Sequence, residues 1–412
     1  MINLCFDNLL SDRPDYPWPN LVKTLGNIAD ADLYEHRGSF SNLHPRTDFP
    51  RIVDYLRDEG VDYQLFKTDS APPNSLYLAN VCWFDHSVDY FSLMQPESLE
   101  RLQKREIKFV FIYCESDSAL AIQKTIFKLC GQHNVNPVDV HVILGNAKSN
   151  LVANFHYFND AEILFKRSQQ HNFDQMLQWH NRPRSKKMTM LSRLHKSWRA
   201  YFSSWYWYHN FHHDSYFSYR MVDQGDGMDP ESCPLNSTIK QNSKYQTVLD
   251  DFLNLAPFSA DTLTDQDHNQ FGTRVDAHYQ DSYWNCILET HLALHQNMPG
   301  TLITEKTWKV IAHAQPFVIL GNPGSLDHLK DQGYRTFAEI GIDETYDCIL
   351  DPTERFKAVF ELVKNIHSMS WDQLAELNLL SKEIVEHNQQ LYWADKKDRL
   401  ESVFLQIQNI DL

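Results

Sequence analysis

In residues 1–170, short apolar runs alternate with stretches in which apolar residues recur at helical spacing. The apolar runs predict strands over residues 2–6, 76–84, 108–113 and 138–144. The last two runs are dense in β-branched and aromatic residues and end in polar or glycine positions, which is typical of strands. The spacing between the runs predicts helices over residues 96–104 and 118–130. Strands that alternate with helices predict an α/β domain with a parallel sheet and right-handed crossovers.

A polar passage rich in Asn and Gln covers residues 145–178, and we place a domain boundary near residue 175. Residues 188–208 are dense in Trp, Tyr and Phe and predict a helix. A buried packing helix is favoured there over an aromatic binding platform. Residues 223–243 have the composition of a loop. We therefore expect domains over 1–175 and 176–375, and terminal helices over 376–412 that could return across the first domain.

The last third of the chain carries clear start and stop signals. Thr304 is placed to cap a helix that runs through Ala314, and Pro316 ends that helix. The apolar run 317–320 then predicts a short buried strand that ends at Gly321. This order of helix, strand and turn is again typical of an α/β domain.

Further capping signals follow the predicted strand. We expect Ser325 to cap a short helix that Gly333 ends. Asp351 and Ser370 each begin a sequence with capping-box chemistry, the first with proline at the initial helical position. Two longer helices are therefore predicted from these residues onward.

Length and charge narrow the class of protein. A chain of 412 residues exceeds what one hydrophobic core usually serves, so two domains are expected. Hydrophobic residues make up 42% and charged residues 22%, which indicates a globular chain. Acidic residues outnumber basic ones, 54 against 38, and the formal charge of -16 opposes nonspecific attraction to nucleic acid or anionic membrane. A nucleic-acid acceptor would need a local basic groove.

The seven cysteines are widely spaced, odd in number and without a Cys-x-x-Cys pair. This pattern favours free thiols in a reducing compartment over a disulfide framework or a zinc ribbon. The first residues lack the basic start and apolar run of a signal peptide, and no run of some 18 apolar residues follows. We expect a protein of the cytoplasm, without a membrane span.

The sharpest chemical signal is Thr304-Glu305-Lys306 at the start of a predicted helix. Free backbone amides at a helix start attract phosphate, and a lysine there adds a full positive charge. The carboxylate of Glu305 could accept hydrogen bonds from ribose hydroxyls. The three residues therefore suit a nucleoside diphosphate, although an ordinary capped helix start with a solvated Glu and Lys would look the same.

The longer pattern around these residues resembles a known family. Thr-Glu-Lys, an aromatic residue, an apolar helix, Gln-Pro-Phe and a Val-Ile-Leu-Gly strand together resemble the donor-binding motif of fucosyltransferase-type glycosyltransferases. The sequence is even more similar to glycosyltransferase-like proteins of bacteriophages, in which Asn-Pro-Gly-Ser-Leu and Gly-Tyr-Arg-Thr-Phe have counterparts. The resemblance covers about residues 284–340. It implies a GT-B fold, in which two Rossmann-like domains face a central cleft.

The resemblance also implies roles for individual residues. It places Glu305 at the nucleotide ribose, Lys306 at the pyrophosphate and Glu289 in the donor pocket. Asn181 with Lys187 is similar to an Asn and a basic residue that the family carries at the start of its second domain. The family has arginine where this chain has Lys187, and a lysine cannot replace a bidentate guanidinium. The phosphate role could therefore fall to Arg184 or Arg193 instead.

Two patterns raise the alternative of a metal site. Asp265 and Asp267 have the spacing that a metal-dependent GT-A glycosyltransferase uses for manganese, but no apolar strand precedes them, which favours a solvated loop. His209, His212 and His213 are close in sequence, but no fourth ligand is fixed by spacing. We therefore expect no metal and no cofactor, with a nucleotide-sugar as donor substrate and basic side chains that neutralise the departing diphosphate.

An inverting transfer needs a base that accepts the proton of the attacking hydroxyl. Such a base is expected where ligands bind in parallel sheets, at the carboxyl end of a strand. Glu115 follows one predicted strand and is the first candidate, Asp85 follows another, and Asp7 is a third. Each could equally be a capping or solvated carboxylate. A retaining transfer would need none of them.

The sequence therefore predicts a glycosyltransferase, a hexosyl- or pentosyltransferase independent of metal, with a hydroxyl acceptor. The acceptor could be a glycan or a hydroxymethylated base of phage DNA. The charge of -16 disfavours DNA, whereas the basic residues between Arg182 and Arg199 keep it open. A noncatalytic nucleotide- or glycan-binding protein on the same scaffold is the alternative. The nucleotide, the sugar, the stereochemistry and the oligomeric state are left open.

Overall fold

The computed structural model describes most of the chain in two compact units. The described residues are 1–6, 56, 59–81, 86–113, 119–145, 154–158, 182–222, 233–260, 276–293, 301–394 and 397–410. Unit 1 comprises Met1–Leu164, His295–Gly300 and Asp395–Leu412, and unit 2 comprises Phe165–Leu294 and Thr301–Ala394. Each unit contains its own parallel sheet, which confirms the expected α/β class with two Rossmann-like sheets.

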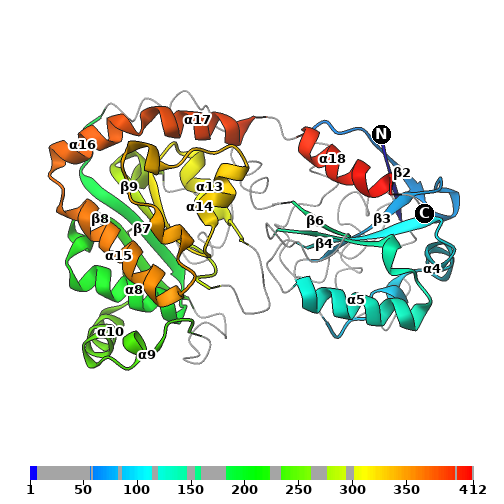
Figure 1. The fold of residues 1–412 in the computed structure, drawn as a ribbon, viewed down its shortest axis with the longest axis horizontal. Coiled ribbons are helices and arrows are strands. Elements are labelled where there is room, and N and C mark those ends of the chain that lie inside the picture. The colour runs from blue at the N-terminus through cyan, green and yellow to red at the C-terminus, as the bar shows by residue number, and fades with distance from the viewer. Residues whose placement is uncertain are drawn as a thin grey trace. The chain divides into compact units, whose positions relative to one another are not determined.

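Unit 1 is built on a six-stranded parallel sheet in the order β2-β1-β3-β4-β5-β6 (Figure 1). The strands are β1 (Ile2–Phe6), β2 (Tyr63–Lys67), β3 (Ser75–Val81), β4 (Ile107–Tyr113), β5 (Val140–Leu144) and β6 (Phe155–Tyr157). The helices are α4 (Pro96–Gln103), α5 (Ala119–His133) and α18 (Lys397–Gln408), with 3-10 turns η1 (Thr68–Ser70), η2 (Phe91–Leu93) and η3 (Pro137–Asp139). All four predicted strands are present. The short strands β2 and β6 were not predicted, because neither forms an apolar run long enough to stand out.

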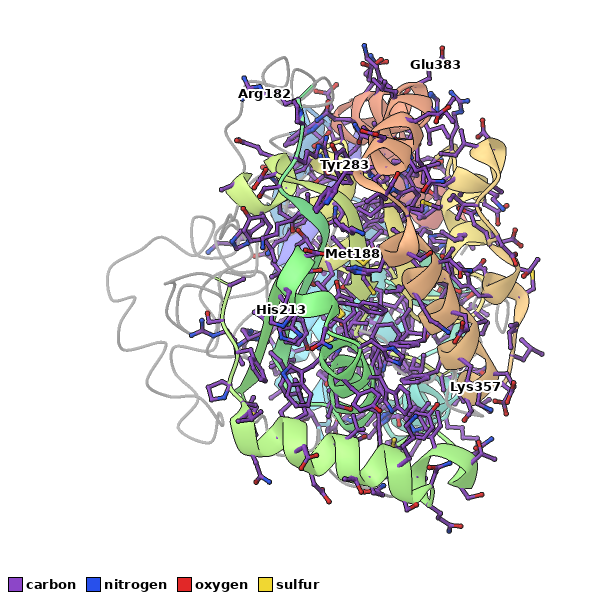
Figure 2. The ribbon with its side chains drawn as sticks, turned by 90° about the vertical axis from the view of Figure 1, so that its left-hand side faces the viewer. Arg182, Met188, His213, Tyr283, Lys357 and Glu383 are labelled. Carbon is purple, nitrogen blue, oxygen red and sulfur yellow. The ribbon has the colours of Figure 1, made fainter. Side chains whose placement is uncertain are left out.

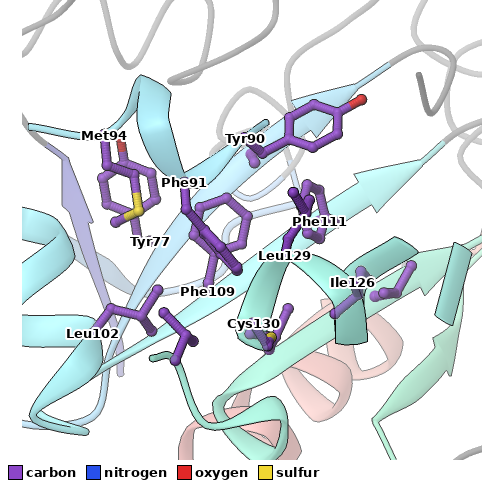
Figure 3. Packing of buried hydrophobic residues seen from close by; sticks show 14 of the residues in the cluster. Tyr77, Tyr90, Phe91, Met94, Leu102, Phe109, Phe111, Ile126, Leu129 and Cys130 are labelled. Carbon is purple, nitrogen blue, oxygen red and sulfur yellow. The ribbon is translucent and has the colours of Figure 1, made fainter. Parts of the chain in front are cut away.

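The core of unit 1 is aromatic on one face of this sheet (Figure 3). Tyr77 of β3 stacks on Phe109 of β4 with ring centres 5.4 Å apart. Phe91 meets Phe109 edge to face, and Tyr90 meets Phe111 in the same way. These residues are fully buried or nearly so. Edge-to-face and offset aromatic pairs add specific geometry to the apolar area that they bury.

The C-terminal helix α18 belongs to unit 1. Lys108, fully buried in β4, donates from Nζ to the carbonyls of Ile407 and Gln408 at 2.8 and 3.2 Å and also to that of Ile410. The backbone N–H of Asn3 donates to Oε1 of Gln408 at 2.9 Å. A lysine at a helix C-terminus satisfies carbonyls that the helix leaves open and complements its dipole. Lys108 therefore fastens the end of the chain to the central strands of this unit.

Unit 2 is built on a four-stranded parallel sheet in the order β10-β9-β7-β8. The strands are β7 (Lys186–Leu194), β8 (Ser215–Val222), β9 (Ser282–Leu288) and β10 (Phe317–Leu320). The helix expected over residues 188–208 is wrong in its first part, because β7 extends to Leu194 and the helix begins only at Ser197. Met188 and Met190 are fully buried, whereas Thr189 and Leu191 line a pocket. The pattern thus has the period of two of a strand.

The helices of unit 2 surround this sheet (Figure 1). They are α8 (Ser197–Tyr208), α9 (Ser237–Lys240), α10 (Ser243–Leu255), α12 (Asp276–Gln280), α13 (Glu305–Ala312), α14 (Ser325–Asp331), α15 (Pro352–Ser368), α16 (Trp371–Leu380) and α17 (Lys382–Trp393). Shorter turns are η5 (Phe211–Asp214), η6 (Phe337–Ile340) and η7 (Thr345–Cys348). The stretch 223–243, expected to be a loop, contains α9 in its described part.

Most of the predicted helix starts are confirmed. The side chain of Asp351 accepts from the amides of Thr353 and Glu354, and Ser370 forms a complete capping box with Gln373. The prediction for Ser325 is wrong. Gly324, with φ 77°, is the capping residue, and Ser325 donates its hydroxyl to the carbonyl of Asn322. A glycine fits this left-handed position without strain.

Within the described part of the chain, no helix combines the length and the apolar character that crossing a bilayer requires.

Candidate functional site

The strand order of unit 2 defines where a ligand is expected. The chain passes from β7 to its neighbour β8 and then returns to place β9 on the other side of β7. The carboxyl ends of β7 and β9 therefore flank the point at which the direction of winding reverses. Ligands of open parallel sheets bind in the crevice at such a point.

A pocket of about 160 Å³ lies at this place. Among the described residues its lining comprises Thr189, Leu191, Arg193, Leu194, Arg199, Ser218, Arg220, Tyr279, Asn285, Cys286, Ile287, Leu288, Glu305, Lys306, Lys309 and Val310. Five of these side chains are basic and one is acidic, and they come from β7, α8, β8 and α13. The pocket is therefore suited to an anion.

The strands β7 and β8 contribute alternate residues to the pocket. Thr189, Leu191 and Arg193 of β7 and Ser218 and Arg220 of β8 line it, and we call this side of the sheet the pocket face. The intervening residues are mostly apolar and buried, and we call the opposite side the aromatic face; its members include Met188, Met190, Phe217 and Tyr219. Parallel strands usually carry apolar residues on both faces. Polar and basic residues on one face therefore indicate a site.

An irregularity in the sheet accompanies the two arginines of these strands. The register between β7 and β8 shifts between Ser192 and Leu194, opposite Arg220 and Met221. Met221 has a positive φ of 55°, which is uncommon for a residue other than glycine. Bulges bend a strand and redirect side chains next to functional sites. This bulge lies at the positions of Arg193 and Arg220.

The start of α13 is held by a carboxylate from the end of β9. Glu289, fully buried, accepts the backbone N–H of Thr304 at 3.1 Å and its hydroxyl at 2.5 Å. It also accepts the hydroxyl of Thr307 at 2.6 Å and the backbone N–H of Thr290 at 3.1 Å. Thr304 is the capping residue, as predicted, and its hydroxyl oxygen accepts the N–H of Lys306.

These contacts change the interpretation of the helix start. A helix N-terminus attracts an anion, and here the anion is supplied by the chain itself. Glu289 occupies this end, and the carboxylate of Glu305 accepts its own backbone N–H. The expectation that the first amides face phosphate groups does not fit this geometry, and Glu289 lies behind the pocket as a buried support of the helix. The positive charge in the pocket comes from side chains.

Lys306 and Glu305 lie at the pocket with about a quarter of each side chain exposed, 27% and 25%. Lys306 Nζ donates to Glu305 Oε1 at 2.8 Å, to the Thr290 hydroxyl at 3.1 Å and to the Thr304 hydroxyl at 3.2 Å. Burial disfavours the carboxylate of Glu305, but the ammonium groups of Lys306 and Lys309 outweigh it and lower the pKa of Glu305 to about 2. Glu305 is therefore ionised at neutral pH.

Lys309 lines the pocket one helical turn beyond Lys306. Burial, with the positive charges of Lys306 and Arg193, lowers the pKa of Lys309 to about 8, although Glu305 opposes the shift. Cations that disfavour one another in a partly buried pocket gain from a bound anion.

Three basic residues of the pocket, Arg199, Arg220 and Lys309, were not among the predicted site residues, and Arg199 is the most deeply buried of them. It is 1% exposed, and Nη2 donates to the backbone carbonyl of Glu289 at 2.5 Å. Its Nε has no hydrogen-bond partner among the described residues. Burial lowers the pKa of Arg199 to about 10, against the charges of Glu289 and Glu305. A buried guanidinium nitrogen without a partner is costly, so the residue is suited to a ligand that supplies an acceptor.

Lys187 and Arg184, both considered for a phosphate role, lie elsewhere. Lys187 Nζ donates to the carbonyls of His367 and Met369 at 2.7 and 2.9 Å, at the C-terminus of α15. Arg184 Nη1 donates to Gln315 Oε1 at 2.8 Å. Both residues lie at the amino edge of the sheet, because they precede or begin β7, whereas the pocket lies toward the carboxyl edge. Arg193, six residues after Lys187 and near the end of the strand, does line the pocket.

The remaining candidates lie outside the described residues or are partly buried or exposed histidines. Glu115, Asp85, Asp7, Asn181, Asp265 and Asp267 fall outside the described residues. His209 stacks on Phe211 and His212 on Trp207, and burial lowers the pKa of both histidines. In the described ranges no group of three or more His, Cys, Asp or Glu side chains could hold a metal ion.

Comparison with known proteins gives only distant similarity. No protein-family model and no curated protein matches the sequence. The structure is similar to a UDP-forming α,α-trehalose-phosphate synthase from Burkholderia xenovorans, with 8% identity, a TM-score of 0.37 and coverage of 92% of this chain and 86% of that one. It is also similar to an E. coli protein in a structure described as "Trehalose-6-phosphate from E. coli bound with UDP-2-fluoro glucose". The two chains share 13% identity with a TM-score of 0.38, and the match covers 93% of this chain and 86% of that one. Likeness at this level supports no conclusion about function. The functional argument depends on the pocket instead.

Proposed function

We propose that this protein is a GT-B type glycosyltransferase and that the pocket of unit 2 binds the diphosphate of a nucleotide-sugar donor. The observation that carries the proposal is the convergence of basic side chains from four elements at the point where the sheet reverses its winding. The first amides of α13 already have acceptors, since Glu289 accepts that of Thr304, the Thr304 hydroxyl accepts that of Lys306, and the Glu305 carboxylate accepts its own. The charged side chains must therefore provide the binding energy for the phosphates.

Each side chain has a chemical role in this proposal. Lys306 and Arg199 contact the diphosphate, and Glu305, ionised beside Lys306, accepts hydrogen bonds from the ribose. Fixed positive charge at the departing diphosphate stabilises the charge that develops as the glycosidic bond breaks. The reaction then needs no bound metal. An inverting reaction would also need a base, and Glu115, Asp85 and Asp7 stay our candidates.

The acceptor is a hydroxyl group in this proposal. A glycan hydroxyl is favoured over a hydroxymethylated base of phage DNA, because a chain with a formal charge of -16 repels a polyanion except at a local basic groove. Retention on duplex DNA that falls steeply with added salt would favour the DNA acceptor instead.

The proposal is tested with Lys306→Ala. A thermal-shift screen of UDP, GDP, CMP and dTDP sugars first identifies the donor, because bound nucleotide stabilises the native state. Calorimetry with that donor should then show affinity on the order of 100-fold weaker for Lys306→Ala, because a charge-assisted contact to phosphate is removed. The variant should unfold at nearly the temperature of the parent.

The matched control is Lys357→Ala. Lys357 lies on α15, 39% of its side chain is exposed, and it pairs with Glu354 at 2.8 Å. Its removal should leave donor affinity unchanged. Equal affinity of Lys306→Ala and the parent would contradict the assignment. Slow release of free nucleoside diphosphate from the cognate donor would identify an enzyme, whereas binding without release would favour a noncatalytic nucleotide-binding protein.

A further inference from the structure

Arg355 makes an unusual set of contacts behind the pocket. It lies in the first turns of α15 and is 1% exposed. Nε donates to the carbonyl of Gly321 at 3.0 Å, and Nη2 donates to the carbonyl of Leu292. Nη1 donates to the carbonyls of Ile349 and Leu350. All three nitrogens therefore bind backbone, and among the described residues no carboxylate accepts a hydrogen bond from them.

These carbonyls belong to three loops that the sequence separates widely. Gly321 follows β10 directly, and Leu292 lies four residues beyond the end of β9. Residues 349–350 precede α15. The planar guanidinium has five N–H groups in a fixed fork, so one side chain can hold several loops at once. Burial lowers the pKa of Arg355 to about 10, although the charges of Asp347 and Asp351 oppose the shift. Burying this charge is costly, and the hydrogen bonds to the carbonyls compensate for it.

The loop at Gly321 touches the support of the pocket. A Cβ atom added to Gly321 would lie 3.0 Å from Cβ of Glu289 and 3.3 Å from its Cγ, so the two segments are in close contact. The backbone N–H of Glu289 also donates to the carbonyl of Leu320 at 3.0 Å. Glu289 in turn binds the capping residue of α13 through its carboxylate and Arg199 through its carbonyl. Fixing Gly321 therefore fixes the residue on which both phosphate contacts depend.

We propose that Arg355 is a positioning residue for the pocket. By holding the loops after β9 and β10 together it fixes Glu289, and through Glu289 it sets the places of Lys306 and Arg199. The inference rests on the proposed function insofar as these two residues bind phosphate. The positioning itself concerns the protein alone and is measured without ligand.

The test compares Arg355→Lys with Val363→Ala. Val363 lies on the same helix, eight residues beyond Arg355, and is fully buried, so its truncation lowers stability and leaves the contacts of Arg355 with the carbonyls intact. Lysine keeps the charge but cannot bind all the carbonyls from one nitrogen. Amide hydrogen exchange at Thr290, Thr304 and Lys306 should be roughly 10-fold faster in Arg355→Lys and unchanged in Val363→Ala. Affinity for inorganic pyrophosphate should fall by about 2- to 30-fold in Arg355→Lys alone.

A second variant approaches the same contact from the other side. Gly321→Ala leaves Arg355 in place but forces Glu289 to move, and it should reproduce the faster exchange at Thr304 and the weaker pyrophosphate binding. This variant tests the link from the Gly321 loop through Glu289 to the pocket, which the positioning role requires, even if Arg355→Lys does not fold. Exchange and affinity that match Val363→Ala in both variants would overturn the positioning role. If the parent protein binds neither pyrophosphate nor any nucleoside diphosphate, the proposed function fails, and the exchange measurement still decides whether Arg355 holds the loops.

Discussion

The two faces of the sheet in unit 2 come from the same strands but carry different side chains. On the aromatic face, Tyr206 of α8 stacks on Phe217 of β8 with ring centres 5.5 Å apart, and Tyr219 packs against Phe252 of α10. On the pocket face, the neighbouring positions are Ser218 and Arg220. Because successive strand residues point to opposite faces, one stretch of chain serves both purposes. Figure 2 draws the side chains along these elements and labels Met188 of β7. The comparison predicts that stability and ligand binding can be changed separately.

The largest expected effect is on the aromatic face, with Phe202→Ala. Phe202 is fully buried in α8 and meets Phe356 and Phe360 of α15 edge to face, with ring centres 5.3 and 5.5 Å apart. Its removal leaves a cavity that the packed helices cannot fill. The free energy of unfolding should fall by about 3–5 kcal/mol, measured by urea denaturation.

Pyrophosphate affinity of the folded Phe202→Ala protein provides the control. Phe202 is one turn from Arg199 on the same helix, so this variant tests whether two neighbouring residues of α8 affect stability and binding independently. Equal dissociation constants for the variant and the parent would show that packing on the aromatic face does not affect binding on the pocket face. A large loss of affinity would show that the two faces are coupled through α8.

The next effect concerns the pocket face, with Arg199→Gln. Pyrophosphate affinity should fall on the order of 100-fold, because a desolvated charged contact is lost. The free energy of unfolding should change by less than about 1 kcal/mol, since losing the hydrogen bond to Glu289 is offset by removing the cost of burying a charge. Arg199→Lys should restore only part of the affinity. Lower stability with unchanged affinity would assign Arg199 to the core.

The local signals in the sequence explain why the region around α13 could be predicted. Thr304, Asp351 and Ser370 accept hydrogen bonds from amides two or three residues away. Such a cap can be predicted from a few consecutive residues of the sequence. The strand over 317–320 is likewise a continuous apolar run between a proline and a glycine. Features of this kind depend on few distant contacts.

The residues of the pocket could not be predicted in the same way. The aromatic residues favour one helix over 188–208, and this pattern hides the strand that has Lys187 near its start and Arg193 near its end. Six residues of strand separate them by about 20 Å. That distance decides which of the two reaches the pocket. The role of Glu289 could not be predicted from local sequence either, because only the folded chain brings its carboxylate to Thr304, fifteen residues away.

The smallest expected effect is a pH dependence on the aromatic face. His367 is 7% exposed and stacks on Phe211 with ring centres 4.3 Å apart, and its Nε2 forms a hydrogen bond with the Tyr206 hydroxyl at 2.9 Å. Burial, and then the charge of Lys187, lowers the pKa of His367 to about 3. Between about pH 6.5 and 3 the unfolded chain binds a proton there that the folded chain does not. Stability is therefore lost as the pH falls through this range.

His367→Gln isolates this contribution from that of other groups, including His141 of unit 1, whose pKa burial also lowers to about 3. Between pH 7.5 and 5.5 the parent should lose about 1.4 kcal/mol more unfolding free energy than the variant, measured by urea denaturation at each pH. Pyrophosphate affinity should be the same in both proteins, because His367 packs against α8 on the face opposite the pocket. Parallel pH curves would mean that His367 binds its proton at the same pH in the folded and the unfolded state. Water would then reach His367 on the aromatic face. The two faces would no longer differ in that the aromatic face excludes water and the pocket face carries charge.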